Sequence, residues 1–168
     1  MKFKLLILFA LSLSLYPLSE WRQHAASASL RTSLMTAVKT DNTDAVRMLL
    51  QKGADPNSRT SASGWSALHY AVRNGNVEIM QELLNAGADP NYAGTMEGQT
   101  NQVVSERPLV IAQAAQDLAS QVPPSNMEAT LQQGGVNDPA LLKSMRDPGA
   151  ADRYQKVVDV LAKVTREN

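Results

Sequence analysis

The feature of this sequence that most restricts its fold is an internal repeat. The pentapeptide GADPN occupies Gly53 to Asn57 and recurs thirty-four residues later, at Gly87 to Asn91. The match continues upstream in the same register, where six apolar or amide residues have identical partners: Leu34, Ala37, Val38, Asn42, Leu49 and Leu50 recur as Leu68, Ala71, Val72, Asn76, Leu83 and Leu84. A fixed period of this size indicates stacked units, each too small to bury its own hydrophobic face.

Each unit is predicted to form two short helices joined by a tight turn. In the second copy, three residues at i, i+3, i+4 spacing define a first helix: Leu68, Ala71 and Val72. The segment Asn74-Gly75-Asn76 ends that helix, because glycine readily adopts the left-handed conformation found at helix ends. A second helix follows from Val77 and ends at Gly87, and the rest of GADPN turns the chain toward the next unit.

The second copy resembles an ankyrin repeat. Its SALH segment, Ser66 to His69, stands where the family usually has TPLH, and its NGN turn and GADPN ending have the matching spacing. The segment from Leu34 to Asn57 is similar to a more degenerate N-terminal copy, in which Asp41 replaces the turn glycine. The resemblance implies an all-α fold, a short ankyrin-repeat solenoid of about three helix-turn-helix units with long loops. It also implies that His69 braces the turn between units and is not a catalytic base.

A third unit is predicted in a form interrupted by an insertion. RPLVIAQAA, Arg107 to Ala115, matches the family motif through its Pro-Leu pair, and YQKVVDVLAKV, within 153–164, has the apolar spacing of a displaced second helix. We therefore expect units at about 29–57, 58–91 and 92–168, with an insertion at 121–150 and a long loop at 92–106. One or two short helices are expected in the insertion, one with capping-box spacing at Ser125 and one starting at Asp138-Pro139. The insertion is either an exposed loop or a partner-binding element.

The first 28 residues are predicted to be a targeting segment. The basic start MKFK is followed by an uncharged apolar run from Leu5 to Leu18, which is typical of a secretory signal. Ala26-Ser27-Ala28 is a plausible cleavage site, and cleavage there would leave Ser29 as the N-terminus. The alternative is an uncleaved segment that anchors the chain in the inner membrane. Together with the absence of cysteine, this predicts a bacterial protein that is periplasmic or secreted.

The residues that usually carry catalysis or bind metal are almost missing. The chain of 168 residues has no cysteine and two histidines, so a transition-metal site would depend on carboxylates. The glycine pair at 134–135 lacks the GK[ST] that completes a phosphate-binding loop. The formal net charge of zero gives no reason to expect a nucleic acid as partner. The sequence therefore predicts a non-enzymatic protein with no cofactor and no metal, and membrane contact only through an uncleaved N-terminal segment.

The ankyrin resemblance implies that a partner protein binds the concave face, which the first helices and the loops between units form. The candidate partner-binding residues are Ser63, Trp65, Tyr70, Arg73 and Asn74 in the second unit, and Thr36, Lys39 and Thr40 in the first. Tyrosine, tryptophan and arginine often dominate interface energetics. The alternative is that Trp65 packs on the 92–106 loop and Arg73 pairs with a neighbouring acid.

Two functions fit these predictions. One is an adaptor that binds another protein in the bacterial envelope, in its specific form an inhibitor or immunity protein that neutralises a toxin or effector. The other is an accessory or protective scaffold protein that serves an envelope enzyme, for instance by holding it at the membrane.

Overall fold

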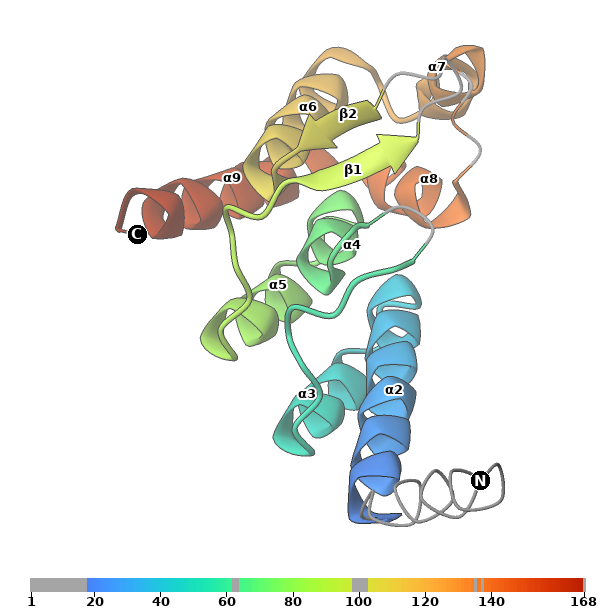
Figure 1. The fold of residues 1–168 in the computed structure, drawn as a ribbon. Coiled ribbons are helices and arrows are strands. Elements are labelled where there is room, and N and C mark those ends of the chain that lie inside the picture. Colours follow the sequence, from blue (N-terminus) through green and yellow to red (C-terminus); the bar gives the residue numbers. More distant parts are fainter. Residues whose placement is uncertain (1–17, 62–63, 98–102, 135, 137, 168) are drawn as a thin grey trace, which may run out of the picture.

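The computed structural model describes residues 18–61, 64–97, 103–134, 136 and 138–167, and it is a stack of helix pairs with one β-hairpin (Figure 1). The elements, in chain order, are α2 (Leu18–Lys39), α3 (Thr43–Gln51), α4 (Ala67–Arg73), α5 (Val77–Asn85), β1 (Gly94–Glu97), β2 (Val103–Glu106), α6 (Pro108–Gln121), α7 (Met127–Gln133), α8 (Pro139–Met145) and α9 (Ala150–Glu167).

Three helix pairs form the solenoid. Helix α2 packs on α3, α4 on α5, and α6 on α9. The first helices α2, α4 and α6 stack on one another in order, and so do the second helices α3, α5 and α9, as Figure 1 shows. The predicted ankyrin solenoid of about three units is therefore confirmed, and α9, which packs on α6, is the second helix of the third pair.

The core lies between the stacked pairs. The repeated apolar residues Leu34, Val38, Leu68, Val72 and Leu83 are all fully buried. A smaller cluster fills the space beneath the insertion, where Met127 and Met145 meet the fully buried Tyr154 of α9. The hydroxyl of Tyr154 donates a hydrogen bond of 2.6 Å to the carbonyl oxygen of Arg73, so α9 is tied to the end of α4.

The repeat is visible in the backbone as well as in the sequence. Asn42 and Asn76 each cap the following helix by accepting a hydrogen bond of 3.0 Å from a backbone N–H. Asp41 has a φ of 55° where the equivalent Gly75 has 66°, so the first unit keeps the left-handed turn without a glycine. Aspartate is among the few residues that tolerate this conformation. The Asp41 carboxylate also accepts a 3.2 Å hydrogen bond from the side-chain amide of Asn74 in the next unit.

The GADPN turns of successive units are bonded to each other. The side-chain amide of Asn57 donates to the carbonyl oxygen of Gly87 at 3.0 Å, and its oxygen accepts from the N–H of Asp89 at 2.8 Å. Asp55 and Asp89 each accept a hydrogen bond from the backbone N–H two residues later, which closes the turn. The repeated pentapeptide is therefore an exit turn and also a link between units.

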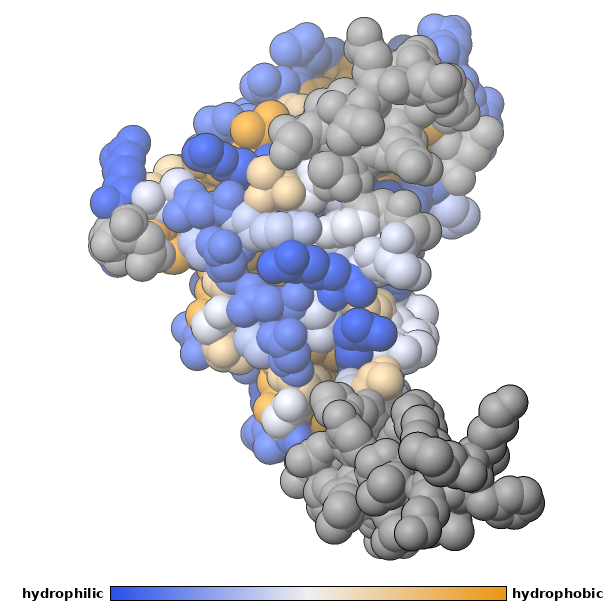
Figure 2. All heavy atoms as spheres, viewed as in Figure 1, coloured by the Kyte–Doolittle hydropathy of each residue, from blue (hydrophilic) through white to orange (hydrophobic). Residues whose placement is uncertain are grey.

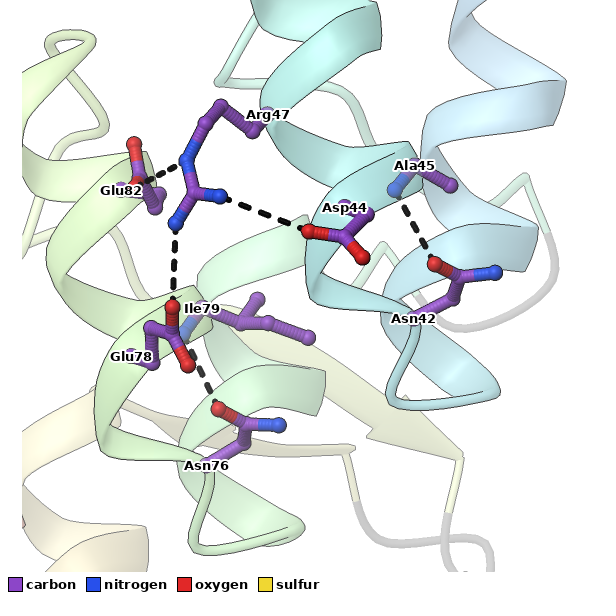
Figure 3. Close-up of polar contacts among 8 residues, drawn as sticks. All are labelled: Asn42, Asp44, Ala45, Arg47, Asn76, Glu78, Ile79 and Glu82. Atoms are coloured by element: carbon purple, nitrogen blue, oxygen red, sulfur yellow. Dashed lines mark hydrogen bonds and ion pairs between the residues drawn. The ribbon is translucent and has the colours of Figure 1, made fainter.

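Charged residues join the second helices of the first two units on their outer side (Figure 3). Arg47 of α3 reaches α5, where its Nε donates to Glu82 at 2.9 Å and its Nη2 donates to Glu78 at 3.0 Å. A longer contact of 3.5 Å goes to Asp44 on its own helix. The hydrogen bonds to the two glutamates raise the pKa of Arg47, led by the one to Glu82. These ion pairs are largely exposed, so we regard them as fixing the register of α3 against α5 more than as a major source of stability.

The insertion contains the two expected short helices, α7 and α8. Helix α8 starts at Asp138-Pro139 as predicted, and the Asp138 carboxylate caps it by accepting from the N–H groups of Ala140 and Leu141. The capping box expected at Ser125 is wrong, because Asn126 is the N-cap of α7 and makes no side-chain cap bond. The hydroxyl of Ser125 instead donates to the side-chain oxygen of Asn126 at 3.2 Å.

The segment expected as a long loop at 92–106 contains a β-hairpin. Strands β1 and β2 pair antiparallel, with Gly94 opposite Glu106 and Glu97 opposite Val103. The β-branched pair Val103-Val104 is a strand signal that the repeat-based interpretation overlooked. The hairpin leads directly into α6, whose start is fixed by Pro108 in the first turn.

The apolar run of the predicted targeting segment lies almost entirely outside the described residues. The proposed cleavage position after Ala28 falls within α2, a continuous helix of 22 residues. Among the helices of the described part of the chain, none is both long and apolar enough to cross a membrane.

Candidate functional site

A groove opens between α2, α4 and the connection that follows the first GADPN. Its volume is about 670 Å³. The residues that line it are Arg31, Thr32, Met35, Thr36, Lys39, Arg59, Thr60, Ser61 and Tyr70. Figure 2 shows that hydrophilic side chains gather in the middle of the face viewed there, where α4 and the α3–α4 connection lie. The groove lies on the side of the first helices and the inter-unit connection, which is where the predicted binding face was placed.

Helix α2 contributes its side of the groove through one helical face. Arg31, Met35 and Lys39 are spaced by four residues, so their side chains lie one above another. Met35 is buried at the base, whereas Arg31 and Lys39 are exposed. The predicted residues Thr36 and Thr40 are also exposed, and each donates its hydroxyl proton to a carbonyl oxygen one turn earlier in α2.

The connection between α3 and α4 is held in place at its base. The backbone N–H of Thr60 donates to the carbonyl oxygen of Trp65 at 3.0 Å, and Arg59 forms a β-bridge with Ser66. The Arg59 guanidinium lies 3.7 Å above the ring of Tyr92, which comes directly after the second GADPN. Ser63, one of the predicted site residues, lies outside the described residues.

Tyr70 and Lys39 meet where the two units join. Tyr70 is half-buried on α4, and the Lys39 ammonium lies 4.6 Å from the centre of its ring. A cation at this distance from an aromatic face is attracted by the ring quadrupole. Both residues were predicted for the binding face, and both line the groove and also a smaller adjoining hollow of about 450 Å³.

Arg73 points into the adjoining hollow but is already paired. Its guanidinium forms an ion pair with Asp138, the residue that caps α8 of the insertion. The same guanidinium lies 5.5 Å from the ring centres of Trp65 and Tyr70. The alternative interpretation of Arg73, pairing with an acid of the same chain, is the one the structure supports.

The expectation that Trp65 is exposed is wrong. Its side chain is only 3% exposed, and its ring lies 5.6 Å from the His69 ring and 5.3 Å from the Tyr70 ring. The backbone at Gly94 covers it so closely that a Cβ there would lie 2.9 Å from the Trp65 ring. Trp65 therefore packs under the start of the 92–106 segment, which was the alternative.

Asn74 is likewise buried, at 4% exposure, which corrects its predicted place on the binding surface. Its side-chain amide faces Asp41 of the first unit and not the solvent. The residue sits at the helix-ending turn, where the neighbouring unit stacks against it. The helical period of the sequence could not show whether Asn74, at the end of α4, faces the solvent or the neighbouring unit.

His69 braces the turn between units, as the resemblance implied. Its Nε2 accepts a 3.2 Å hydrogen bond from the N–H of Gly94, and its Nδ1 lies 2.7 Å from the hydroxyl oxygen of Ser66. The backbone N–H of Ser66 also points to Nδ1, at 3.3 Å, so both ring nitrogens are engaged within the fold. The histidine is fully buried, so it links α4 to the hairpin and does not face the groove.

The electrostatic character of the groove is one-sided. Three of its lining residues, Arg31, Lys39 and Arg59, are cationic, and none is acidic. Within the described residues, no aspartate or glutamate forms an ion pair with any of the three. No group of acidic and histidine side chains in this part of the chain could hold a metal ion. The groove is thus a positively charged surface formed by α2, α4 and the α3–α4 connection.

Comparison with known proteins identifies the family of this chain. No curated protein matches the chain. A family model described as ankyrin repeats, in three copies, matches residues 8–93, which is more than half of the chain. Ankyrin repeats are protein–protein interaction modules and are typically non-enzymatic. The repeat, the stacked helix pairs and this match agree, and the chain belongs to the ankyrin-repeat family.

Proposed function

We propose that this protein binds another protein of the bacterial envelope through the groove between α2, α4 and the α3–α4 connection. The observation that carries the proposal is the set of exposed cations and the half-buried Tyr70 gathered in that groove. The core uses neighbouring positions of the same helices, where Leu34, Val38 and Leu68 are fully buried, and Met35 at the base of the groove joins that core. Arg31, Lys39 and Arg59 are exposed to a partner, and arginine and tyrosine are residue types that contribute strongly at interfaces.

The envelope location rests on the sequence of the first 28 residues. A basic start followed by a short apolar run supports export, and the lack of cysteine is compatible with a bacterial envelope protein. N-terminal sequencing of the protein from envelope fractions is the test. A start at Ser29 supports a cleaved, periplasmic or secreted protein, whereas a start at Met1 supports an inner-membrane anchor and contradicts cleavage.

The specific form we propose is an inhibitor or immunity protein that neutralises a toxin or effector. A small interaction module can occlude the active site of another protein with no chemistry of its own. The alternative is an accessory or protective scaffold for an envelope enzyme. Adding the purified chain to its captured partner separates the two, because an inhibitor abolishes the partner's activity at equal molar amounts and an accessory protein preserves or raises it.

The binding surface is tested by affinity capture with matched variants of the full chain. Lys39→Glu combined with Tyr70→Ala changes the groove, and Gln81→Ala combined with Met48→Ala changes exposed residues on the second helices. We expect the first variant to lose the partner and the second to retain it. Circular dichroism of each variant confirms that it is folded. A partner retained by the folded groove variant would show that the groove is not the binding surface.

A further inference from the structure

In the part of the chain that the structure describes, no acidic side chain forms an ion pair with the cations of the groove, and two of them lie over aromatic rings. The Arg59 guanidinium lies 3.7 Å from the Tyr92 ring centre, and the Lys39 ammonium lies 4.6 Å from that of Tyr70. Ring faces attract cations but do not neutralise their charge. The positive charge therefore remains available, and the side chains are held close to a binding geometry. A carboxylate that enters this groove need not break an existing ion pair.

The surface already binds one carboxylate. The adjoining hollow shares Lys39 and Tyr70 with the groove, and there the carboxylate of Asp138 pairs with Arg73. Asp138 belongs to the insertion, sixty-five residues away along the chain. An acidic residue from a separate segment is thus placed on the stacked first helices beside aromatic rings. The Arg73–Asp138 pair shows the kind of contact that an acidic residue of a partner would make with the cations of the groove.

From these observations we propose that the groove binds an extended acidic segment of a partner protein, whose carboxylates pair with Arg31, Lys39 and Arg59. The inference rests on the proposed function and adds the chemical class of the partner segment. The groove has a volume of about 670 Å³. A space of this size suits a short stretch of chain better than a flat protein surface, since pockets of this size enclose most of a small ligand. Charge complementarity of this kind governs specificity and the rate of association.

A protein segment fits this groove better than a nucleic acid does. Nucleic acids bind to extended basic surfaces on domains with a strongly positive charge. This chain has a formal net charge of zero, and the adjoining surface carries the anion Asp138. A phosphate backbone that tracked past the groove would meet Arg73 already paired with that carboxylate, so this arginine offers it no unpaired charge. A short segment that places its acids in the groove alone would not need Arg73.

The proposal is tested with fluorescein-labelled octapeptides in which four residues are glutamate or, in the control, glutamine. Fluorescence anisotropy measures their binding to the full chain at low salt. We expect the glutamate peptide to bind at least about tenfold more tightly than the glutamine peptide, and raising the salt should weaken it because the cations are exposed. Equal binding of the two peptides would overturn the proposal.

Charge-reversal variants locate the site. Lys39→Glu combined with Arg59→Glu should weaken binding of the glutamate peptide by about tenfold or more, whereas Lys163→Glu on the exposed surface of α9 should change it by less than about twofold. Should the double reversal not fold, Lys39→Gln combined with Arg59→Gln removes the charge with less repulsion. An unchanged affinity in a folded groove variant would refute the site. Tighter binding of an eight-nucleotide oligothymidylate than of the peptide would refute the assignment to an acidic protein segment.

The capture experiment keeps this inference separate from the proposed function. The captured partner is challenged with the glutamate peptide in excess. Release of the partner supports the acidic segment. A partner that depends on the groove but is not released leaves the proposed function standing and overturns the acidic class, while a partner that is indifferent to the groove variants overturns the proposed function itself.

Discussion

Replacing Gly75 by alanine tests the stacking of the third unit, because this glycine lies where α9 meets the turn of the second unit. A Cβ at Gly75 would lie 3.0 Å from Cζ and 3.2 Å from Cε1 of Tyr154. The Tyr154 ring is fully buried, and its hydroxyl is bonded to the carbonyl oxygen of Arg73, so it has little freedom to move away. The equivalent position in the first unit carries Asp41, whose side chain bonds to the Asn74 amide and so finds room.

The expected loss of stability in Gly75→Ala is the sum of a backbone term and an overpacking term. Gly75 has a φ of 66°, and an L-residue in the left-handed region costs about 1–2 kcal/mol. Overpacking a buried site adds about 1–3 kcal/mol. Gly75→Ala should therefore destabilise the fold by about 2–5 kcal/mol. Gly53 and Gly87 have φ values of 85° and 93° with no atom within 4 Å of the built Cβ, so alanine there should cost about 1–2 kcal/mol from the backbone alone.

Urea unfolding followed by circular dichroism measures the three variants against the unsubstituted chain. The expected result is that Gly75→Ala costs more than either Gly53→Ala or Gly87→Ala, by about the overpacking range of 1–3 kcal/mol. The m-value is compared as well, to establish that the denatured state is unchanged. Equal costs at the three positions would refute the placement of Tyr154 against this turn and, with it, the displaced second helix of the third unit.

Three further predictions concern the core, the titration of a buried group and the links between units. Leu83→Ala should destabilise the fold by about 2–5 kcal/mol, because Leu83 is fully buried. Met48→Ala is the control and should have little effect, because that side chain is 48% exposed. A loss of stability under about 1 kcal/mol for Leu83→Ala in urea unfolding would contradict the place of Leu83 in the core. Burial raises the pKa of the Tyr154 hydroxyl above its ordinary value of 10.0, so its contribution to stability is present below about pH 10 and is lost as the pH rises through the folded-state pKa. Tyr154→Phe should lack that part of the alkaline decline, and an identical decline in both proteins, measured by unfolding from pH 8 to 12, would argue against the burial. Asn57→Ala removes two hydrogen bonds to the next GADPN turn and should lower the free energy of unfolding by about 1 kcal/mol. Asn91→Ala, at the equivalent position one unit later, is the control. Equal losses of stability in thermal unfolding would mean that the hydrogen bonds between the two turns add nothing.

The repeat made much of the fold predictable. Leu68 and Val72 were placed on one helical face by their spacing, and both are fully buried, as are their repeat equivalents Leu34 and Val38. The helix start at Asp138-Pro139 was also readable, because a side-chain cap and a proline in the first turn act within one helical turn. The two strands at 94–97 and 103–106 were not predicted, because each has only four residues, too few for an alternating pattern to be distinct beside the helical repeat.

The candidate site was only partly predictable. Lys39 and Tyr70 were named for the binding face and line the groove, but Arg31 and Arg59 were missed. Arg59 lies just after GADPN in the connection to the next unit, which is a position from which the family's loops project, so a search for charges in these connections would have found it. Arg31 could not be found in this way, because it lies in the part of α2 that precedes the first repeated position, Leu34.

The units, their helices and the turns between them follow from the amino-acid sequence alone, because they depend on apolar spacing and on caps within a few residues. Tertiary structure decided which polar and aromatic side chains remain accessible. Trp65 is covered by the backbone at Gly94, and Arg73 is neutralised by Asp138, contacts that join segments far apart in the chain. Burial and charge pairing depend on what the stacked units and the insertion bring together in space, and no local pattern in the sequence specifies that.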